Sequence, residues 1–267
     1  KLTGSLPSLP TSLKRQYGMF DGCSGLTGSI PLLPAGLQEH GTYMFRNCKG
    51  LTGPIPNIPD SLWDTTSMFA GCSGLSGNIP ELPSRLSYGN RMFHNCSGLT
   101  GSIPKLPDSL TKGEAMFYNC SGLTGNIPEL PDNLGEGSDM FSGCSGLTGN
   151  IPTLPANLVY GEDMFNDCRN LSGNIPTLPA TLKNGSRMFN NCYGLTGSIP
   201  QLPSGLAEGE YMFGGCSGLT GVRTVNGQYP YQYLTNISTS AGMVFNCKDA
   251  VRQYFPTSWG GTCTTCQ

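Results

Sequence analysis

The sequence predicts a repeat solenoid, a rod of stacked rungs with a parallel β-sheet along one side. A cysteine recurs in steps of 24 residues, apart from a first step of 25. Each one lies in nearly the same phrase, M-F-x-x-C-x-x-L-[ST]-G-x-[IL]-P-x-[LI]-P-x-x-L. So small a unit can bury its apolar face only by stacking on copies of itself. The period is set by Cys23, Cys48, Cys72, Cys96, Cys120, Cys144, Cys168, Cys192 and Cys216.

The repeats extend over residues 1–221, and we expect them to form about nine 24-residue rungs. Neighbouring strands of the sheet should lie about 4.8 Å apart. The extra residue of the first step falls within residues 37–45, between the second proline and the Met-Phe pair. We therefore interpret that part of each rung as a loop that tolerates insertion.

One unit, residues 116–134, illustrates the expected local structure. Residues 116–120 predict a short helical turn that places Met and Cys on one face. Residues 123–127 alternate apolar or glycine with polar residues, which is the period of a short strand. Pro128 and Pro131 donate no backbone hydrogen bond and favour an extended, polyproline-like arm. The sheet should therefore lie on one side of the solenoid, with turns and arms on the other.

The repeated phrases resemble those of leucine-rich repeats. LTGSIP at residues 99–104 is similar to the LTGxIP phrase of plant-type repeats. MFSGCSGLTG at residues 140–149 more closely resembles the bacterial surface repeats of the BspA type and their Met-Phe-x-x-Cys relatives. The chain lacks the long LxxLxxLxLxxN segment of plant receptors, and it has a double proline that BspA repeats lack. The resemblance implies an extracellular or cell-surface module that binds proteins or promotes adhesion, with no catalytic residues to transfer.

Composition argues against several classes of function. Charged residues make up 12% of the chain and the formal net charge is -2, so no basic surface for nucleic acid is expected. No stretch approaches the roughly 20 apolar residues that a membrane span needs. His40 and His94 are the only histidines, and no catalytic arrangement recurs at a usable spacing. We therefore predict a protein that is not an enzyme and has no cofactor or metal.

The cysteines have two interpretations. The nine periodic thiols should point in parallel into the core, which is poor geometry for disulfides, so we expect a structural ladder of small apolar side chains. Cys263 and Cys266 form a CxxC pair at the end of the chain. A local disulfide is the favoured interpretation, and a metal site with Cys247 as a third ligand is the alternative.

Both ends depart from the repeat. Residues 222–267 are interpreted as a C-terminal cap with a degenerate last rung at 241–247, a possible helix at 248–255 and the CxxC pair. The N-terminal segment begins in strand phase, without a polar capping segment. An open edge there would allow head-to-tail self-association into a filament. Its candidate residues are Leu2, Leu6 and Leu9.

Two surfaces are candidates for binding. Outward positions of the strands form a regular T-x-[SN] strip that could match ice or a polysaccharide, or could simply be a wet strand face. Its candidate residues are Thr100, Ser102, Thr124, Asn126, Thr148 and Asn150. Positions such as Glu81, Lys105, Glu129 and Thr153 instead vary from rung to rung, as a recognition surface requires. The hypotheses are a surface scaffold that binds protein or glycan, a filament subunit, and an ice- or surface-binding protein.

Overall fold

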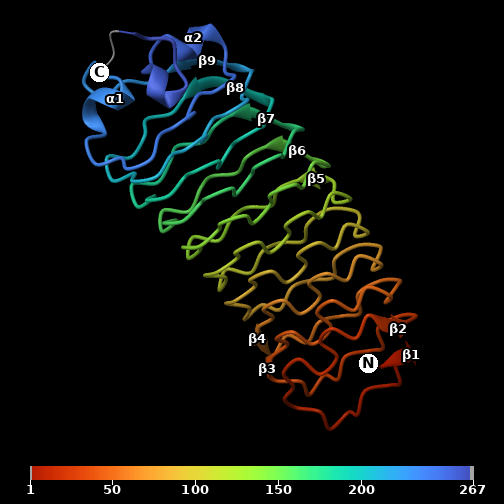
Figure 1. Cartoon of the computed structure of the whole chain (residues 1–267). Coiled ribbons are helices and arrows are strands. Elements are labelled where there is room, and N and C mark those ends of the chain that lie inside the picture. The colour runs from red at the N-terminus through yellow and green to blue at the C-terminus, as the bar shows by residue number, and fades with distance from the viewer. Residues whose placement is uncertain (1, 265–267) are drawn as a thin grey trace.

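A computed structural model describes residues 2–264 and shows a rod of stacked turns (Figure 1). The chain winds from one end of the rod to the other, so the two termini lie at opposite ends. Each turn carries one cysteine at an equivalent position, from Cys23 in the first turn to Cys247 in the last. The predicted repeat solenoid is confirmed, with a tenth turn beyond the nine of the strict repeat.

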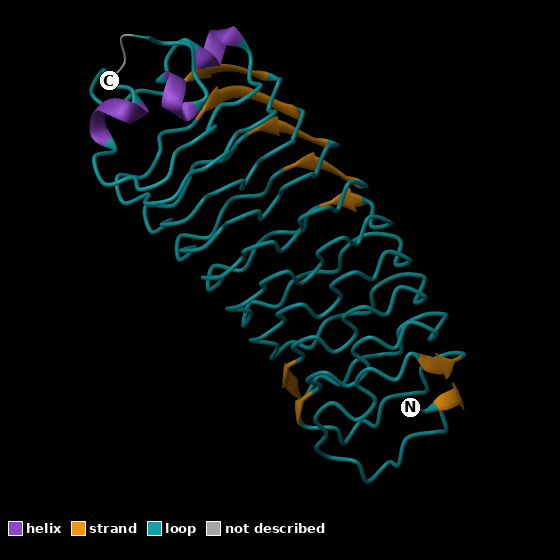
Figure 2. Cartoon of the chain, viewed as in Figure 1, coloured by secondary structure: helices purple, strands orange, loops and turns teal. Residues whose placement is uncertain are grey.

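A parallel ladder runs along one long side of the rod (Figure 2). It consists of short strands joined by isolated parallel bridges, such as Gly77 with Leu99 and Gly101 with Leu123. From Leu26 onward, the Leu of each rung points inward, whereas the following Thr or Ser is exposed. This is the sheet predicted from the alternating pattern. The strands are β1 (Thr3–Ser5), β2 (Gly25–Thr27), β5 (Gly125–Asn126), β6 (Leu147–Asn150), β7 (Leu171–Asn174), β8 (Gly194–Ile199) and β9 (Leu219–Val222).

A second parallel ladder runs along the opposite long side, where the sequence predicts only a variable loop. It begins with β3 (Glu39–His40) and β4 (Leu62–Asp64) and continues as single bridges from rung to rung. The register shifts between Glu39 and His40, and Glu39 has a positive φ of 66°. The extra residue of the first repeat step is therefore accommodated as a bulge in this ladder.

The Met-Phe-x-x-Cys segment forms consecutive turns, not the short helix that the sequence suggests. Met116 and Cys120 donate N–H bonds to carbonyls three residues back, Gly113 and Phe117. Phe117 N–H instead donates to the Met140 carbonyl of the next rung. Residues before Met and before Cys have positive φ, which breaks the helical conformation. The segment therefore bonds alternately within its own rung and to the next one.

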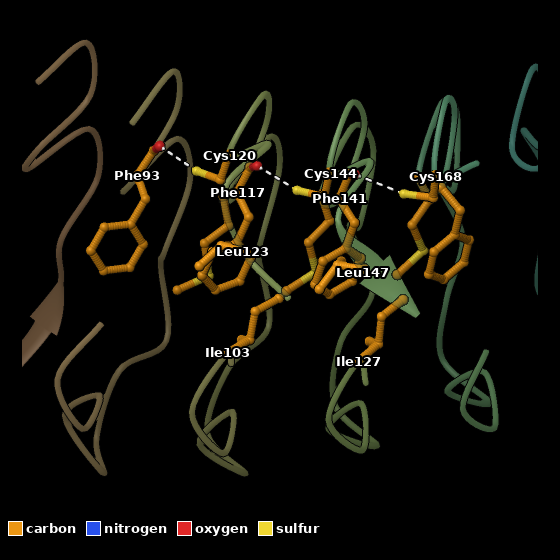
Figure 3. Packing of buried hydrophobic residues seen from close by; sticks show 14 of the residues in the cluster. Phe93, Ile103, Phe117, Cys120, Leu123, Ile127, Phe141, Cys144, Leu147 and Cys168 are labelled. Atoms are coloured by element: carbon orange, nitrogen blue, oxygen red, sulfur yellow. Dashed lines mark hydrogen bonds between the residues drawn. The ribbon is translucent and has the colours of Figure 1, made fainter. Parts of the chain in front are cut away.

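The core is a set of columns that run the length of the rod. Phe45 to Phe213 are fully buried, and consecutive rings from Phe20 onward stack with centroids 5.6–5.8 Å apart. Met, Cys and Leu columns lie beside them, with Ile at the end of each strand (Figure 3). Each rung covers the apolar surface of its neighbour, as the sequence predicts.

The C-terminal end of the rod carries the regular helices, α1 (Pro230–Tyr233), α2 (Asp249–Arg252) and the 3-10 turn η1 (Thr257–Trp259). In Figure 1 they lie across the last rungs, and α2 contacts β9. Val251, Phe255 and Trp259 are buried there. Within residues 2–264, no helix is long and apolar enough to cross a membrane.

Candidate ligand-binding surfaces

The periodic cysteines form a hydrogen-bonded column inside the rod. From Cys48 onward each thiol donates to the phenylalanine carbonyl of the preceding rung at 2.9–3.1 Å, as Cys120 does to Phe93 (Figure 3). These thiols are free and buried, and burial raises the pKa of Cys120 to about 12. Cys23 is free but only partly buried. The column offers packing and hydrogen bonding, and the raised pKa keeps the thiols from becoming nucleophilic thiolates at neutral pH.

The last turn continues this column. Cys247 donates to the Phe213 carbonyl at 3.0 Å. Within 241–247, Met and Cys keep the spacing of the other rungs and Val244 replaces Phe. The step from Cys216 to Cys247 is longer because the insertion lies ahead of this turn. Cys247 is thus placed with the core thiols, which does not suit the role of a third metal ligand.

The CxxC pair is only partly described. Cys263 is disulfide-bonded, and Cys266, the partner that the sequence predicts, lies outside the described residues. Among residues 2–264, no group of three or more His, Cys, Asp or Glu side chains is arranged to hold a metal ion.

The strand strip is the exposed T-x-[SN] surface of the first ladder. The structure brings together its six predicted residues on three adjacent rungs: Thr100, Ser102, Thr124, Asn126, Thr148 and Asn150 are all exposed. The glycine between the two polar positions has positive φ, 77° at Gly125 and 76° at Gly149. At Gly149, a side chain would also collide with the Asn126 amide of the preceding rung. The strip therefore repeats nearly the same chemistry from rung to rung, with Pro54 and Val222 as the exceptions.

The residues of the candidate assembly edge differ in burial. Leu2 is 56% exposed, Leu6 is partly buried against the core and Leu9 is buried. Leu6 and Leu9 thus contribute to packing within the first rungs. Of the three, Leu2 presents the largest apolar surface to solvent.

The turn segments form a second, variable surface. The residue two positions before each cysteine changes in size and charge from rung to rung, whereas the buried Phe beside it does not change. Glu81, Lys105, Glu129 and Thr153 are also exposed and variable, on the arm between the two prolines. The changing positions before cysteine are Asp21, Arg46, Ala70, His94, Tyr118, Ser142, Asn166, Asn190 and Gly214.

Three adjoining hollows on this surface make up what we call the turn groove. The central hollow, about 540 Å³, is lined by residues of rungs 91–95 and 115–119 together with Asp139. It shares Asn95 and Asn119 with a hollow of about 500 Å³ that reaches back to Asn47. It shares Asn119 with a third, of about 360 Å³, that extends to Arg169. The turn groove thus runs along the rod over several rungs.

An aromatic pair lies in the central hollow. The rings of His94 and Tyr118 stack with centroids 4.6 Å apart and an interplanar angle of 10°. Burial, and then the positive charge of Arg91, lower the pKa of His94, so its imidazole is neutral at pH 7. Arg91 is itself ion-paired with Glu114. The central hollow therefore contains a flat, uncharged aromatic surface beside polar groups.

Asp139 is the unpaired charge of the central hollow. Desolvation by burial raises its pKa to about 6, helped by the negative charges of Asp163 and Glu162. The nearest cation, Arg187, is bound by those two carboxylates, at 2.9 Å each. Within residues 2–264, the Asp139 carboxylate has no hydrogen bond or ion pair, so it is available to a ligand.

A second aromatic group lies along the second ladder. His40 and Trp63 have ring centroids 4.8 Å apart, and Trp63 meets Tyr88 edge-on at 5.5 Å. The Lys112 ammonium lies 5.8 Å from the Tyr88 ring centroid. These rings are tilted to one another, whereas the aromatic pair of the turn groove is stacked and lines a hollow, so the turn groove is the better-formed site.

The turn groove was not predicted from the sequence, although the sequence contains a signal for it. The residue before each cysteine has φ between 56° and 75° in all ten turns. Gly, Asn and Asp tolerate this left-handed conformation best, and only these three types occur there. The Asn side chains that line the groove therefore occupy positions where the left-handed backbone conformation restricts the residue type. The ten residues directly before a cysteine are Gly22, Asn47, Gly71, Asn95, Asn119, Gly143, Asp167, Asn191, Gly215 and Asn246.

Stacked rungs with a parallel ladder, an inward leucine per strand and a variable turn surface define a leucine-rich-repeat solenoid. The chain belongs to the family of BspA type leucine rich repeat regions, which matches residues 7–124, 65–196 and 136–242 with 6 copies. The resemblance inferred from the sequence is thereby confirmed. None of the curated proteins matches this chain.

Solved structures of similar proteins come from several bacteria. A leucine-rich repeat protein from Bacteroides ovatus is 23% identical over 96% of this chain and 82% of its own, with a TM-score of 0.43. The T. pallidum leucine rich repeat protein is 25% identical, over 72% and 76%, with a TM-score of 0.42. A leucine rich cell surface protein from Faecalibacterium prausnitzii is 19% identical, over 99% and 86%, with a TM-score of 0.42.

Proposed function

We propose that this protein is a non-enzymatic scaffold, displayed outside the cell or on its surface, that binds a protein or glycan through its turn groove. One observation carries the proposal: the turn residue two positions before each cysteine varies from rung to rung over a core that does not vary. His94, Tyr118 and Ser142 occupy equivalent positions above equivalent phenylalanines. Packing alone gives no reason for such variation, whereas recognition of an irregular ligand does.

A binding survey tests the proposal. The purified chain is applied to arrays of surface glycans and extracellular matrix proteins, beside a variant with Arg91, Tyr118 and Asp139 replaced by Ser. We expect wild-type binding that the variant loses. Absence of any binding by the wild type contradicts the scaffold proposal. The extracellular location is tested separately, by labelling intact source cells with an antibody to the chain.

Ice or crystalline-surface binding is supported by a different observation, the exposure of the strand strip. Thr100, Thr124 and Thr148 are exposed at the same position of adjacent rungs, which repeat at about 4.8 Å. Thermal hysteresis of a chilled protein solution tests it. Thermal hysteresis that disappears when these three residues are replaced by Lys supports ice binding. Absence of thermal hysteresis in the wild type excludes it.

End-to-end assembly into a filament is a further proposal from the sequence. Leu2 supports it, since more than half of its surface is exposed beside β1. The mass in solution, measured together with negative-stain images, tests it. Rods joined end to end would support assembly, and a dispersed monomer at high concentration would exclude it.

A further inference from the structure

The His94–Tyr118 pair stands as an isolated aromatic surface in the turn groove. On either side of it, the equivalent positions hold the small residues Ala70 and Ser142. His94 covers one face of the Tyr118 ring, and among the described residues no aromatic side chain stacks on the other. A flat ring between small neighbours suits a ligand with a flat apolar face of its own, and the apolar face of a sugar ring has that form.

The polar groups around this surface have unused hydrogen-bonding capacity. Asn119 donates its amide N–H to the Asn95 side-chain oxygen at 3.1 Å. Within residues 2–264, the Asn119 oxygen and the Asn95 amide nitrogen have no partner, and neither has the Asp139 carboxylate. These groups together offer two acceptors and one donor. A hydroxyl both donates and accepts, so a polyhydroxylated ligand matches this set.

The charges near the central hollow disfavour an anionic ligand. Four carboxylates lie there against two cations. Both cations are already ion-paired within the protein, and the excess is negative. At the central hollow, a sulfated or acidic glycan would meet repulsion and find no unpaired Arg or Lys among the lining residues. Lys49, which has no ion pair within residues 2–264, lines the neighbouring hollow near Asn47. The groups concerned are Glu114, Asp139, Glu162 and Asp163, with Arg91 and Arg187.

The length of the turn groove indicates a chain and not a single sugar. The hollows that share Asn95 and Asn119 extend from Asn47 to Asp167. These end points are five rungs apart, which is about 24 Å at 4.8 Å per rung. A flexible peptide is less suited to this surface, because the central hollow offers no unpaired strand edge and only one apolar patch.

The burial of the unpaired Asp139 carboxylate also supports a ligand in the central hollow. An unpaired carboxylate that is half-buried among like charges lowers stability at neutral pH. Neighbouring rungs hold Ala115 or an ion-paired residue at this position, such as Asp163. A costly group in a hollow is more readily explained by a ligand than by packing.

We propose that the turn groove binds a neutral linear oligosaccharide, with one sugar ring against Tyr118 and its hydroxyls bonded to Asp139, Asn95 and Asn119. This inference rests on the proposed scaffold function and names its ligand class. One sugar lies in the central hollow, and the chain continues along the rod toward Asn47 and Arg169. Binding requires no covalent step and no metal.

Isothermal titration calorimetry tests the proposal with cellohexaose, laminarihexaose and mannohexaose, and with a heparin hexasaccharide as the anionic control. We expect at least one neutral hexasaccharide to bind and heparin not to bind. Tyr118→Ala should weaken binding about fivefold, since an aromatic contact contributes on the order of 1 kcal/mol. Asp139→Asn should weaken it about threefold to tenfold through a weaker hydrogen bond.

The matched control is Tyr160→Ala, an equally large exposed side chain (52% exposed) on the second ladder, outside the groove. The affinity of Tyr160→Ala for the neutral hexasaccharide should equal that of the wild type. Thermal melting confirms that Tyr118→Ala is folded, and the isosteric Asp139→Asn gives a second measurement if it is not. The proposal is overturned if no neutral hexasaccharide binds, if heparin binds instead, or if both groove variants bind like wild type.

These outcomes separate the ligand class from the general function. If the chain binds a protein or acidic glycan on the arrays but no neutral hexasaccharide, the inference fails and the scaffold function stands. If it binds nothing on either test, both fail.

Discussion

The strand strip and the turn groove are built on the same rungs but differ in what they repeat. Along the strip, Thr or Ser, Gly and a small polar residue recur at almost every step. Along the turns, Ala70, His94, Tyr118 and Ser142 succeed one another above an unchanged column of phenylalanines, and His94 and Tyr118 line the groove. The strip is constrained by ladder geometry and the groove is not. An irregular ligand therefore fits the turns better than the sheet, because the surface of the sheet repeats and the surface of the turns varies.

The largest effect is expected in the core that both surfaces share. Phe141 is fully buried between Phe117 and Phe165, at 5.7 Å from each ring centroid. Phe141→Ala should lower the free energy of unfolding by about 3–5 kcal/mol, since it removes buried contacts and leaves a cavity. Urea unfolding followed by circular dichroism measures this. A loss below about 1 kcal/mol would show that the rungs are more loosely packed than the structure indicates.

The left-handed positions distinguish the two surfaces more sharply. Gly149→Ala on the strip should cost about 1–2 kcal/mol, because alanine is strained at a φ of 76°. Gly143→Asn in the turns should cost less, below about 1 kcal/mol, because asparagine tolerates the left-handed region and already occupies this position at Asn95 and Asn119. The Asn119 amide that the new side chain meets must turn away, as the end of a flexible side chain can. Thermal unfolding of the two variants compares them directly. Equal losses would mean that the two positions are under the same constraint.

The unpaired Asp139 carboxylate of the groove leads to a prediction about stability: its replacement should stabilise the folded protein, by an amount that depends on pH. The pKa of Asp139 in the folded protein is about 6, above its ordinary value of 3.8, so folding favours the protonated form. Its destabilising effect therefore develops as pH rises between about 4 and 6 and is complete at pH 7. Asp139→Asn should stabilise the protein by about 1 kcal/mol at pH 7 and by little at pH 4. Urea unfolding at both pH values tests this, and an equal effect at both would contradict it.

Asp163→Asn is the matched control for that experiment, because this carboxylate is bonded to Arg187. It should destabilise the protein at pH 7, the opposite sign to Asp139→Asn.

The smallest effect is expected on the strip itself. Thr100, Thr124 and Thr148 can each become Ser, the residue that stands at this position in Ser76 and Ser172. Each change should alter stability by less than about 0.5 kcal/mol, since the hydroxyl and the exposed position are kept. Affinity of the triple variant for any ligand of the groove should equal that of wild type. A large loss of affinity would move the binding site to the sheet.

Structural features that arise from repeated side chains can be predicted from the sequence. Features that arise from backbone hydrogen bonds alone are harder to predict. The columns of Met, Phe, Cys and Leu, and the first ladder, follow from the period. The second ladder was missed because its residues, such as Tyr88, Lys112 and Glu136, share no side-chain property, and the backbone bridges that join them leave no pattern in the sequence. The groove was missed because residues that line it, such as His94 and Tyr118, differ from rung to rung, and a search for repeats discards such differences.

The column of thiols has a consequence for how motion in the rod can be followed. An alkylating reagent reacts with thiolate, which the raised pKa of the interior cysteines suppresses while each rung stays closed. A thiol reacts once its rung separates from the preceding one and its bond to the phenylalanine carbonyl is broken. Mass spectrometry of the labelled peptides thus measures how often each rung opens. The chain carries its own internal probe of local unfolding at every 24-residue interval.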